Sequence, residues 1–275
     1  MTIIHHIYLI SDSTGETLDR IFMALKAQFK NFKYEVHNFS FTRTENQINK
    51  ILNEAKEKEN SIILYTVVEN KLAKHLTLES ENKNIPCFGV LGDLILNFSK
   101  ILHQKATHIP SGQHALNDEY YERVEAIQFT MNHDDGNMTS DIKNSDIVLL
   151  GVSRTSKTPT SMYLANRGYK TTNIPIIPEK NLPEELKLIK TNKCVVGLIC
   201  DAERLADVRR NRAQSMHEER PGEYTNNKKI ISELENSKKI FKINKWPTID
   251  VTRKSVEETA ASIIKIYEIK NKKNV

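Results

Sequence analysis

Strand-type and helix-type segments alternate along this chain, first over its N-terminal part and again over its C-terminal part. Short apolar runs such as His6–Ser11 and Ser61–Val67 are typical of buried strands, and segments with helical periodicity such as Glu45–Lys58 and Asn70–Asn82 separate them. Strands joined through helices form parallel sheets that bind ligands beyond the carboxyl ends of their strands. The pattern therefore predicts an α/β protein.

The alternation is interrupted once. Pro110–Gly112 predicts a turn, Asn117–Met131 has the periodicity of an amphipathic helix, and the polar stretch His133–Ser140 indicates a loop. With 275 residues the chain is long enough for two cores. We expect an N-terminal βαβ parallel-sheet domain over 1–108, a helical connector over 109–141, and a second α/β domain over 142–275.

The segment from Asp146 to Thr158 is the most informative for function. Ile147–Leu150 is a buried-type strand ending at Gly151, and the following loop brings Lys157 and Thr158 to the start of a predicted helix. Backbone N–H groups at a helix N-terminus bind anions, the lysine reaches terminal phosphates, and the threonine hydroxyl ligates Mg²⁺. This layout favours a phosphorylated substrate, although an ordinary strand-to-helix turn has the same local pattern. We therefore expect 142–275 to be a nucleotide-binding, kinase-like P-loop domain.

One position departs from the G-x-x-x-x-G-K-[ST] spacing of common phosphate-binding loops. Ser156 stands where the second glycine is expected. Because serine carries a Cβ, a left-handed backbone is disfavoured there. We therefore expect this loop to turn differently from a loop with two glycines.

Carboxylates at two places are candidates for the chemistry of phosphoryl transfer. Asp134 and Asp135 lie in a His-Asp-Asp-Gly sequence before the loop strand, where they could act as a base or hold Mg²⁺, or form a plain Asp-Gly turn. Asp201 follows an apolar strand and is, with Thr158, a candidate metal ligand. A helix cap explains an aspartate at that position equally well.

Positive charge for a moving phosphoryl group has two sources. Arg154 lies inside the loop, and Arg204, Arg209 and Arg212 belong to the helix predicted after Asp201, where P-loop kinases carry a mobile lid. Positions 209 and 212 share one helix face, so their guanidinium groups could converge on one phosphate. The alternative is a solvated helix whose arginines pair with neighbouring acidic side chains.

A second candidate anion site lies near the N-terminus. Ser11, Ser13, Thr14 and Gly15 again end a strand and open a helix, so that hydroxyls and free N–H groups gather at a helix start. We expect this loop to bind a second phosphate. A helix cap with a capping-box-like pairing of Thr14 and Thr17 would explain much of the same pattern.

Composition excludes several classes of protein. A net charge of +5, from 40 Lys and Arg against 35 Asp and Glu, does not indicate nucleic-acid binding, and the lack of an apolar run of membrane-spanning length argues against a membrane partner. The three cysteines form no C-x-x-C pair, and histidines such as His5, His6 and His108 have no metal-ligand spacing. We expect a cytoplasmic protein with neither zinc nor disulfides.

In combination, five segments closely resemble the pyruvate, phosphate dikinase regulatory protein family, over almost the entire chain. A sister group, which regulates phosphoenolpyruvate synthase, shares these motifs. The combination of H-D-D-G with G-V-S-R-T-S-K-T-P is highly specific. The segments are Ser11–Thr17, Val124–Gly136, Gly151–Ala165, Ile174–Pro178 with Leu182-Pro183, and Ile249–Ala261.

The resemblance implies a bifunctional enzyme. Such proteins inactivate the dikinase by phosphorylating a threonine with ADP as donor, and they reactivate it by attack of inorganic phosphate, which releases pyrophosphate. For this chemistry the catalytic candidates among the residues are Lys157, Asp134, Asp135 and Arg154, and we expect Mg²⁺ as cofactor. The family's ADP-binding segment has a serine at the position of Ser156, so the resemblance accounts for the departure from the two-glycine pattern. The ADP-binding residues would be Gly151, Val152, Ser153, Arg154, Thr155, Ser156, Lys157 and Thr158.

Other functions remain compatible with the residues. The same chemistry on phosphoenolpyruvate synthase is the first alternative, because the motifs do not separate the two targets. A small-molecule P-loop kinase would use ATP and a free metabolite, and a nucleotide-sensing module would bind ADP without transfer. A homodimer would match a large dimeric target.

Overall fold

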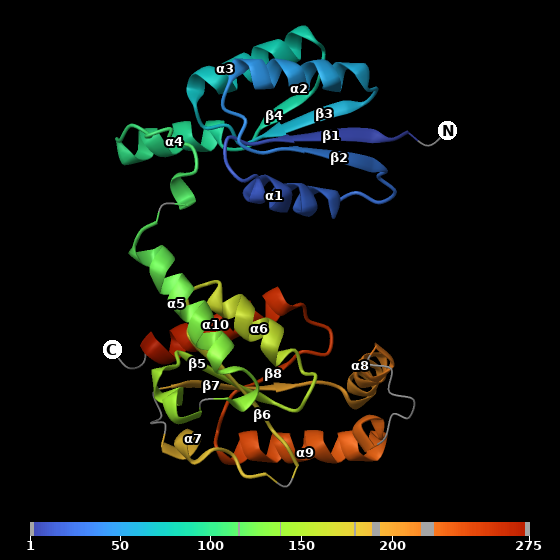
Figure 1. Cartoon of the computed structure of the whole chain (residues 1–275), viewed down its shortest axis with the longest axis vertical. Helices are drawn as coiled ribbons and strands as arrows, with labels where there is room; N and C mark the ends of the chain where they lie inside the picture. The colour runs from blue at the N-terminus through green and yellow to red at the C-terminus, as the bar shows by residue number, and fades with distance from the viewer. Residues whose placement is uncertain are drawn as a thin grey trace. The chain divides into compact units, whose positions relative to one another are not determined.

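The computed structural model describes residues 3–114, 116–137, 139–178, 180–188, 193–215 and 223–272. Contacts divide the chain into two compact units, Met1–Ala115 and Leu116–Val275. Each unit contains a four-stranded parallel sheet with helices packed on its two faces (Figure 1). The predicted α/β class is therefore confirmed. None of the described helices is long and apolar enough to cross a membrane.

The first unit has the strand order β2-β1-β3-β4, so the chain runs outward from β1 in both directions. Ligand crevices in open parallel sheets form where the strand order reverses in this way, which here is the carboxyl edge between β1 and β3. Its elements are β1 (His5–Ile10), α1 (Glu16–Lys26), β2 (Tyr34–Phe39), α2 (Glu45–Glu57), β3 (Ser61–Tyr65), α3 (Asn70–Asn82), β4 (Cys87–Gly89) and α4 (Gly92–Leu102).

The two faces of this sheet bury different sets of β1 side chains, because successive side chains of a strand point to opposite sides. Tyr8 and Ile10 pack in one cluster under α2 and α3, whereas Ile7 and Leu9 pack in another cluster with α1. The apolar alternation of β1 thus fixes which helices cover which face.

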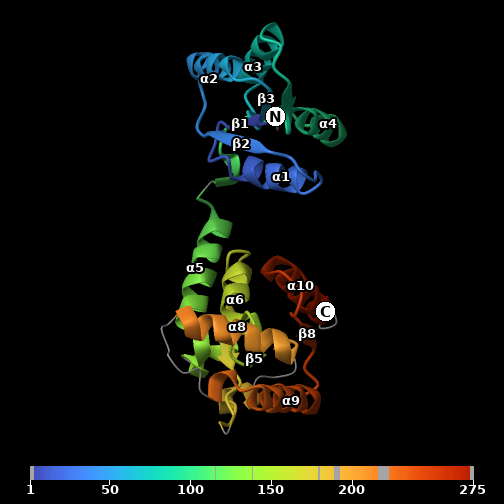
Figure 2. The same ribbon diagram turned by 90° about the vertical axis from the view of Figure 1, so that its right-hand side faces the viewer.

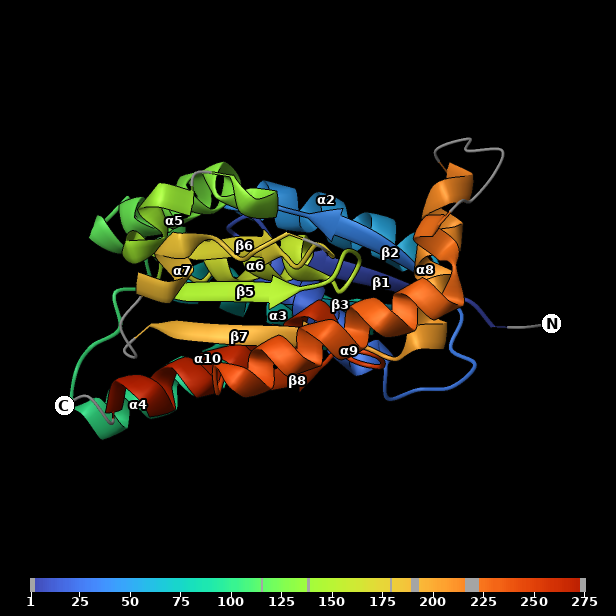
Figure 3. The ribbon, with the colours of Figure 1, turned by 90° about the horizontal axis from the view of Figure 1, so that it is seen from below.

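The second unit has the strand order β6-β5-β7-β8, again with the first strand of the sheet inside it. Figure 3 shows β6, β5 and β7 side by side, with α9 across one face and α8 beyond the carboxyl end of β5. Its elements are α5 (Asp118–Asn132), β5 (Ile147–Gly151), α6 (Lys157–Ala165), β6 (Thr171–Pro175), α7 (Glu184–Leu188), β7 (Cys194–Ile199), α8 (Ala202–Ser215), α9 (Asn227–Ile243), β8 (Thr248–Asp250) and α10 (Val256–Lys272).

The stretch expected as a helical connector divides between the two units. Residues 109–115 belong to the first unit and 116–141 to the second, where α5 lies beside α6 (Figure 2). The hydroxyl of Thr130 accepts a hydrogen bond from the backbone N–H of Thr171 at 3.0 Å, which ties α5 to the start of β6. The short 3-10 turn Asp134–Gly136 follows α5, and its position next to β6 brings it to the carboxyl edge of the sheet.

Candidate functional site

The loop between β5 and α6 leaves the sheet at Gly151. All five residues of β5 are buried. A Cβ at Gly151 would lie 2.6 Å from Oγ1 of Thr155 and 2.7 Å from the carbonyl oxygen of Leu198, closer than real Cβ contacts. Glycine is therefore required where the backbone of the loop crosses the neighbouring strand.

The backbone of the loop is left-handed at two residues that are not glycine. Arg154 has φ 72°, and Ser156, the residue before α6, has φ 59°. The expectation that Ser156 would avoid this conformation is wrong. A left-handed residue with a Cβ costs about 1–2 kcal/mol, and a hydrogen bond from Oγ1 of the buried Thr155 to the carbonyl oxygen of Val152, at 2.9 Å, helps to hold the turn.

Lys157 begins α6 and points back into the loop. Its side chain is 5% exposed, and its ammonium group donates a hydrogen bond to the carbonyl oxygen of Val152 at 3.0 Å. Burial lowers the pKa of this lysine to about 8, against the opposing effect of Asp135 and Asp134. Among the described residues no carboxylate is in direct contact with this ammonium group, and a buried cation of this kind favours the entry of an anion.

A cavity of about 280 Å³ lies over the loop, entirely within the second unit. It is lined by loop residues, by the start of α6 and by one residue each from α8, from β6 and from the turn Asp134–Gly136, called the Asp-Asp turn below. A diphosphate would meet both the helix N-terminus and Lys157 there. The lining residues are Asp135, Ser153, Arg154, Ser156, Lys157, Thr158, Pro159, Pro175 and Val208.

Asp134 and Thr158 meet at the rim of this loop. The hydroxyl of Thr158 donates to Oδ1 of Asp134 at 3.0 Å, and the amide of Asn173 donates both to that carboxylate and to Oγ1 of Thr158, the latter at 3.0 Å. A carboxylate beside a threonine hydroxyl is the oxygen donor set that Mg²⁺ prefers. The candidate residues of the Asp-Asp turn and the loop therefore come together.

Asn173 was not predicted. It lies in β6, is fully buried, and its Oδ1 atom has no hydrogen-bond partner among the described residues. Its position in the chain offers one signal, a polar amide in the middle of a strand that is buried on both sides. Burial of a side-chain amide in a sheet is costly unless it has a partner, so such a residue marks a polar site.

The rest of the Asp-Asp turn is held by His133 and Gly136. His133 is buried, its Nδ1 donates to the carbonyl oxygen of Phe129 at 2.7 Å, and its carbonyl oxygen accepts from the backbone N–H of Asn173 at 3.1 Å. Gly136 has φ 80°, and exposed Asp135 has φ 50°. These bonds fix the turn against β6, so that Asp134 faces Thr158 while Asp135 lines the cavity.

Asp201 lies at the start of α8, where it acts as a helix cap. Its Oδ1 accepts hydrogen bonds from the backbone N–H groups of Glu203 at 2.9 Å and Arg204 at 3.2 Å. The alternative of a helix cap thus accounts for this aspartate. The structure groups Thr158 with Asp134, and Asp201 is not part of that group.

The structure differs from the predicted arginine lid at Arg209. The side chain of Arg209 is 1% exposed, and its guanidinium group pairs with Glu233 at 2.6 Å and donates to the carbonyl oxygen of Ser153 at 3.3 Å. Arg204 and Arg212 are exposed. Arg209 is buried behind the loop 151–158, which we call the phosphate loop after its sequence pattern. It therefore supports the backbone of this loop and does not converge with Arg212 on a phosphate.

Tyr224 links Arg209 to Arg154. Its ring lies 4.7 Å from the Arg209 guanidinium group, its carbonyl oxygen accepts from Arg209 at 3.1 Å, and its hydroxyl accepts from Nε of Arg154 at 3.1 Å. Arg154 itself is exposed and lines the cavity. Of the predicted arginines, Arg154 is the one that the structure places at the loop cavity.

The N-terminal candidate loop lines a separate cavity of about 230 Å³ in the first unit, at the carboxyl edge of β1 and β3. Ser11, Ser13 and Gly15 line it, and the hydroxyl of Ser13 accepts a hydrogen bond from that of Ser111 at 3.0 Å. Gly15, with φ 88°, is the N-cap residue of α1, and it has no side chain to form a capping bond. The capping box suggested for Thr14 and Thr17 is therefore wrong.

Known proteins match this chain over nearly its whole length. Residues 7–264 match the family described as kinase/pyrophosphorylase. A protein of Pelagibacter ubique (strain HTCC1062) is 64% identical over 270 residues, or 98% of both chains. One of Sinorhizobium medicae (strain WSM419) is 44% identical over 263 residues, or 94% of both chains. Both are described, by name, as regulatory proteins of pyruvate, phosphate dikinase.

Proposed function

Because this chain belongs to the kinase/pyrophosphorylase family, we propose that it regulates pyruvate, phosphate dikinase by two opposed phosphoryl transfers. In the first, ADP phosphorylates an active-site threonine of the dikinase and inactivates it. In the second, inorganic phosphate removes that group as pyrophosphate. The observation that carries the proposal is the convergence of Lys157, Thr158 and Asp134 from two separate sequence motifs around one loop.

In the forward reaction the β-phosphoryl group of ADP moves to the threonine. The bond between the β-phosphorus and the bridging oxygen breaks, a bond to the threonine Oγ forms, and AMP leaves. The loop amides and Lys157 hold the diphosphate, and Arg154 faces the negative charge that spreads over the transferred oxygens. Asp135, exposed on the wall of the cavity, orients the acceptor hydroxyl and takes its proton.

Thr158 and Asp134 are the residues that would hold Mg²⁺ in this proposal. When bound, the ion would neutralise negative charge on the phosphate oxygens. Asn173, which donates to both side chains, orients them toward the same point. The hydroxyl and carboxylate oxygens of this pair match the ligand preference of the ion.

In the reverse reaction two anions meet, inorganic phosphate and phosphothreonine. An oxygen of hydrogen phosphate attacks the phosphorus, the bond to the threonine oxygen breaks, and pyrophosphate forms while the threonine oxygen takes up the proton that the attacking phosphate loses. The repulsion between the anions has to be offset by fixed positive charge, for which Lys157 and Arg154 are the candidates at the loop cavity.

We further propose that the cavity of the first unit binds inorganic phosphate. Hydroxyls of Ser11 and Ser13 and the backbone before α1 at Thr14 and Gly15 line the carboxyl edge of β1, where anions bind in parallel sheets. A combined Ser13→Ala and Thr14→Ala variant should weaken the phosphate-dependent reaction and leave the affinity for ADP unchanged. Unchanged kinetics in both directions would contradict this assignment.

The decisive experiment is mass spectrometry of purified dikinase after incubation with this protein and ADP. A phosphate on the acceptor threonine, formed with ADP but not with ATP, is the expected result. Parallel incubations with phosphoenolpyruvate synthase and with free metabolites plus ATP test the two alternative functions. Lys157→Ala should abolish both reactions, whereas Lys239→Ala, which removes an exposed lysine of α9, should change neither.

Two further properties belong to this proposal. A cytoplasmic location is supported by the three free cysteines, since disulfides are characteristic of oxidising compartments. A homodimer is proposed because the target is a large dimeric enzyme. Cell fractionation and sedimentation of the purified protein test these two statements.

A further inference from the structure

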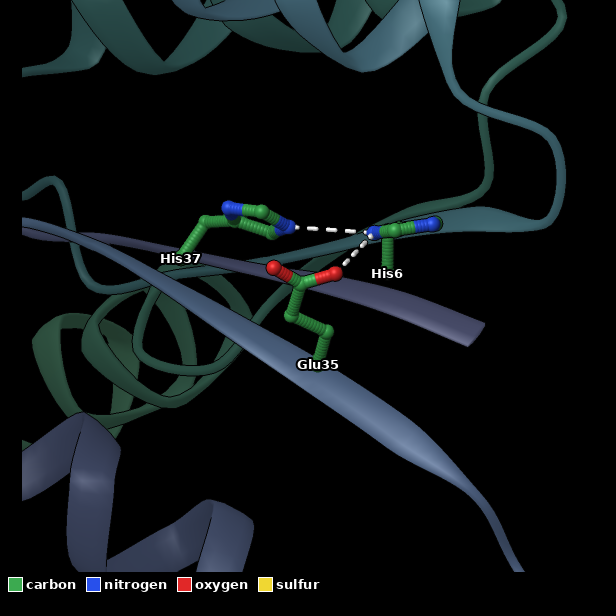
Figure 4. Close-up of side chains that lie close together, drawn as sticks. All are labelled: His6, Glu35 and His37. Atoms are coloured by element: carbon green, nitrogen blue, oxygen red, sulfur yellow. Dashed lines mark hydrogen bonds and ion pairs between the residues drawn. The ribbon is translucent and has the colours of Figure 1, made fainter. Parts of the chain in front are cut away.

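Two histidines and a glutamate meet on one face of the first sheet. His6 lies in β1, and Glu35 and His37 lie in β2, the edge strand of the sheet. The parallel register pairs His6 with Glu35 and Tyr8 with His37, so all of these side chains project toward the face that α2 covers. Figure 4 shows the two imidazole rings and the carboxylate pointing toward one another.

The distances between the ligand atoms are those of a small coordination shell. Nδ1 of His6 lies 3.1 Å from Nε2 of His37 and 3.3 Å from Oε2 of Glu35, and one ligand atom of each residue lies within 4.8 Å of the others. Zinc bonds of about 2.0–2.1 Å in a tetrahedral arrangement separate neighbouring ligand atoms by about 3.3 Å. The distances from Nδ1 of His6 to Nε2 of His37 and to Oε2 of Glu35 therefore match two edges of such a tetrahedron.

The surroundings of His37 support the same assignment. Its second ring nitrogen, Nδ1, lies 3.9 Å from Oε1 of Glu54 on α2, and its ring stacks on Tyr8 with centroids 4.5 Å apart. A carboxylate behind the distal nitrogen of a histidine orients the ring and raises its basicity in metal sites. Stacking on Tyr8 holds the ring of His37 with Nε2 toward His6, and Glu54 lies on the side of Nδ1 without a hydrogen bond to it.

The exposure and the charge of the three side chains are also suitable for binding a metal ion. The side chains of His6 and His37 are 15% and 17% exposed, whereas that of Glu35 is 60% exposed. Solvent reaches the cluster from the side of Glu35, so that an ion can enter and water can complete its shell. Two neutral imidazoles and one carboxylate are a ligand set typical of zinc and unsuited to Mg²⁺ or Ca²⁺, which prefer oxygen ligands.

In contrast to the expectation from the sequence that the chain binds no zinc, we propose that His6, Glu35 and His37 form a zinc site with water in the fourth position. The site lies in the first unit and does not involve the phosphate loop, so it is independent of the proposed phosphotransferase function. It would link the edge strand β2 to the central strand β1. Zinc bound to the folded state alone would stabilise the first unit in proportion to the logarithm of its concentration over Kd.

Calorimetric titration of the full, chelator-treated chain with ZnCl₂ tests this site. The wild type should bind one zinc ion per chain with a Kd in the micromolar range or below, and MgCl₂ should give no heat. Glu35→Gln, which changes an exposed side chain without altering the core, should weaken zinc binding at least about tenfold. His6→Ala should abolish it.

His5→Ala is the matched control. His5 adjoins His6 in the same strand, but its side chain projects to the opposite face and its ring lies 5.4 Å from that of Phe32. Zinc affinity should be unchanged in this variant. Circular dichroism establishes that each variant is folded, and zinc should raise the melting temperature of the wild type and of His5→Ala but not that of His6→Ala.

Two results would overturn the site. One is a wild-type protein that binds no zinc at millimolar concentration. The other is an equal zinc affinity in the wild type, Glu35→Gln and His6→Ala, which would place the bound ion elsewhere. Neither result bears on phosphorylation of the dikinase with ADP, so a failure of this site and a failure of the proposed function are distinguishable.

Discussion

Thr158 donates a hydrogen bond from its hydroxyl to Oδ1 of Asp134 at 3.0 Å, although the two residues lie 24 positions apart. One belongs to the phosphate loop and the other to the Asp-Asp turn after α5. Asn173 holds both from the neighbouring strand. The three side chains form a hydrogen-bonded link between the loop and the Asp-Asp turn.

Asp134→Asn keeps the size of this side chain and removes its charge. We expect turnover to fall by about 100-fold or more, since a charged group at the reacting centre is lost, whereas ADP affinity should change only slightly. Phosphorylation rates and calorimetric ADP titrations measure the two effects. Asp135→Asn is the companion variant, because asparagine tolerates the left-handed backbone at position 135.

A structural role for these carboxylates predicts a different outcome. If ADP binding and turnover fell together and the circular dichroism spectrum of the variant changed, the turn would serve folding and not catalysis. A variant of Asp134 with wild-type turnover would remove it from the proposed site.

Lys157→Met should abolish activity and at the same time stabilise the protein. Burial lowers the pKa of this lysine to about 8, which means that its charge is unfavourable in the folded state. Replacing it by an uncharged side chain of similar length should raise the free energy of unfolding at pH 7 by about 1–2 kcal/mol. Denaturant titration of wild type and variant measures the difference.

The difference in the free energy of unfolding between the wild type and Lys157→Met should change with pH in a defined direction. Below pH 8 the lysine is charged in both the folded and the unfolded state, and between pH 8 and 10.5 the unfolded state binds more protons. The stability of the wild type should therefore rise relative to the variant as the pH increases through this window, by at most about 3 kcal/mol. A constant difference from pH 7 to pH 10 would contradict the lowered pKa.

Arg209→Met should destabilise the second unit. It would leave the carboxylate of Glu233, which is 17% exposed, without the guanidinium group that lies 2.6 Å away, and breaking a buried ion pair costs about 3–5 kcal/mol. The loop would also lose its bond at the carbonyl oxygen of Ser153, so ADP should bind more weakly. Thermal unfolding and ADP titration test both effects.

Arg212→Ala distinguishes support of the loop from a mobile lid. Arg212 is exposed in the same helix, and its removal should change stability by no more than about 0.5 kcal/mol and leave turnover unaltered. A large loss of turnover in Arg212→Ala with full stability would restore the lid hypothesis for this helix.

Gly151→Ala should prevent the loop from adopting its conformation. The added Cβ would lie 2.6 Å from Oγ1 of Thr155 and 2.7 Å from the carbonyl oxygen of Leu198, and such overpacking costs about 1–3 kcal/mol. We expect loss of ADP binding along with reduced stability. Gly92→Ala, where a Cβ would meet no atom within 4 Å, is the control and should behave as wild type.

The loop and the Asp-Asp turn were predictable because each is a short, contiguous motif. Gly151, Lys157 and Thr158 follow a buried strand, and adjacent carboxylates at Asp134 and Asp135 precede a glycine turn. Local rules were misleading where tertiary contacts oppose them. Ser156 is left-handed although its Cβ disfavours that conformation, and a partly buried loop can hold such a residue.

The sequence by itself determined the α/β class and the order of strands and helices, because hydrophobic periodicity and turn residues act over neighbouring positions. Only the tertiary structure decided which distant side chains meet. Asn173 reaches Asp134 because the turn Asp134–Gly136 packs against β6, and His6 reaches His37 because β1 pairs with β2 in a parallel register. Such contacts depend on strand register and on helix packing, which join residues that no local pattern relates.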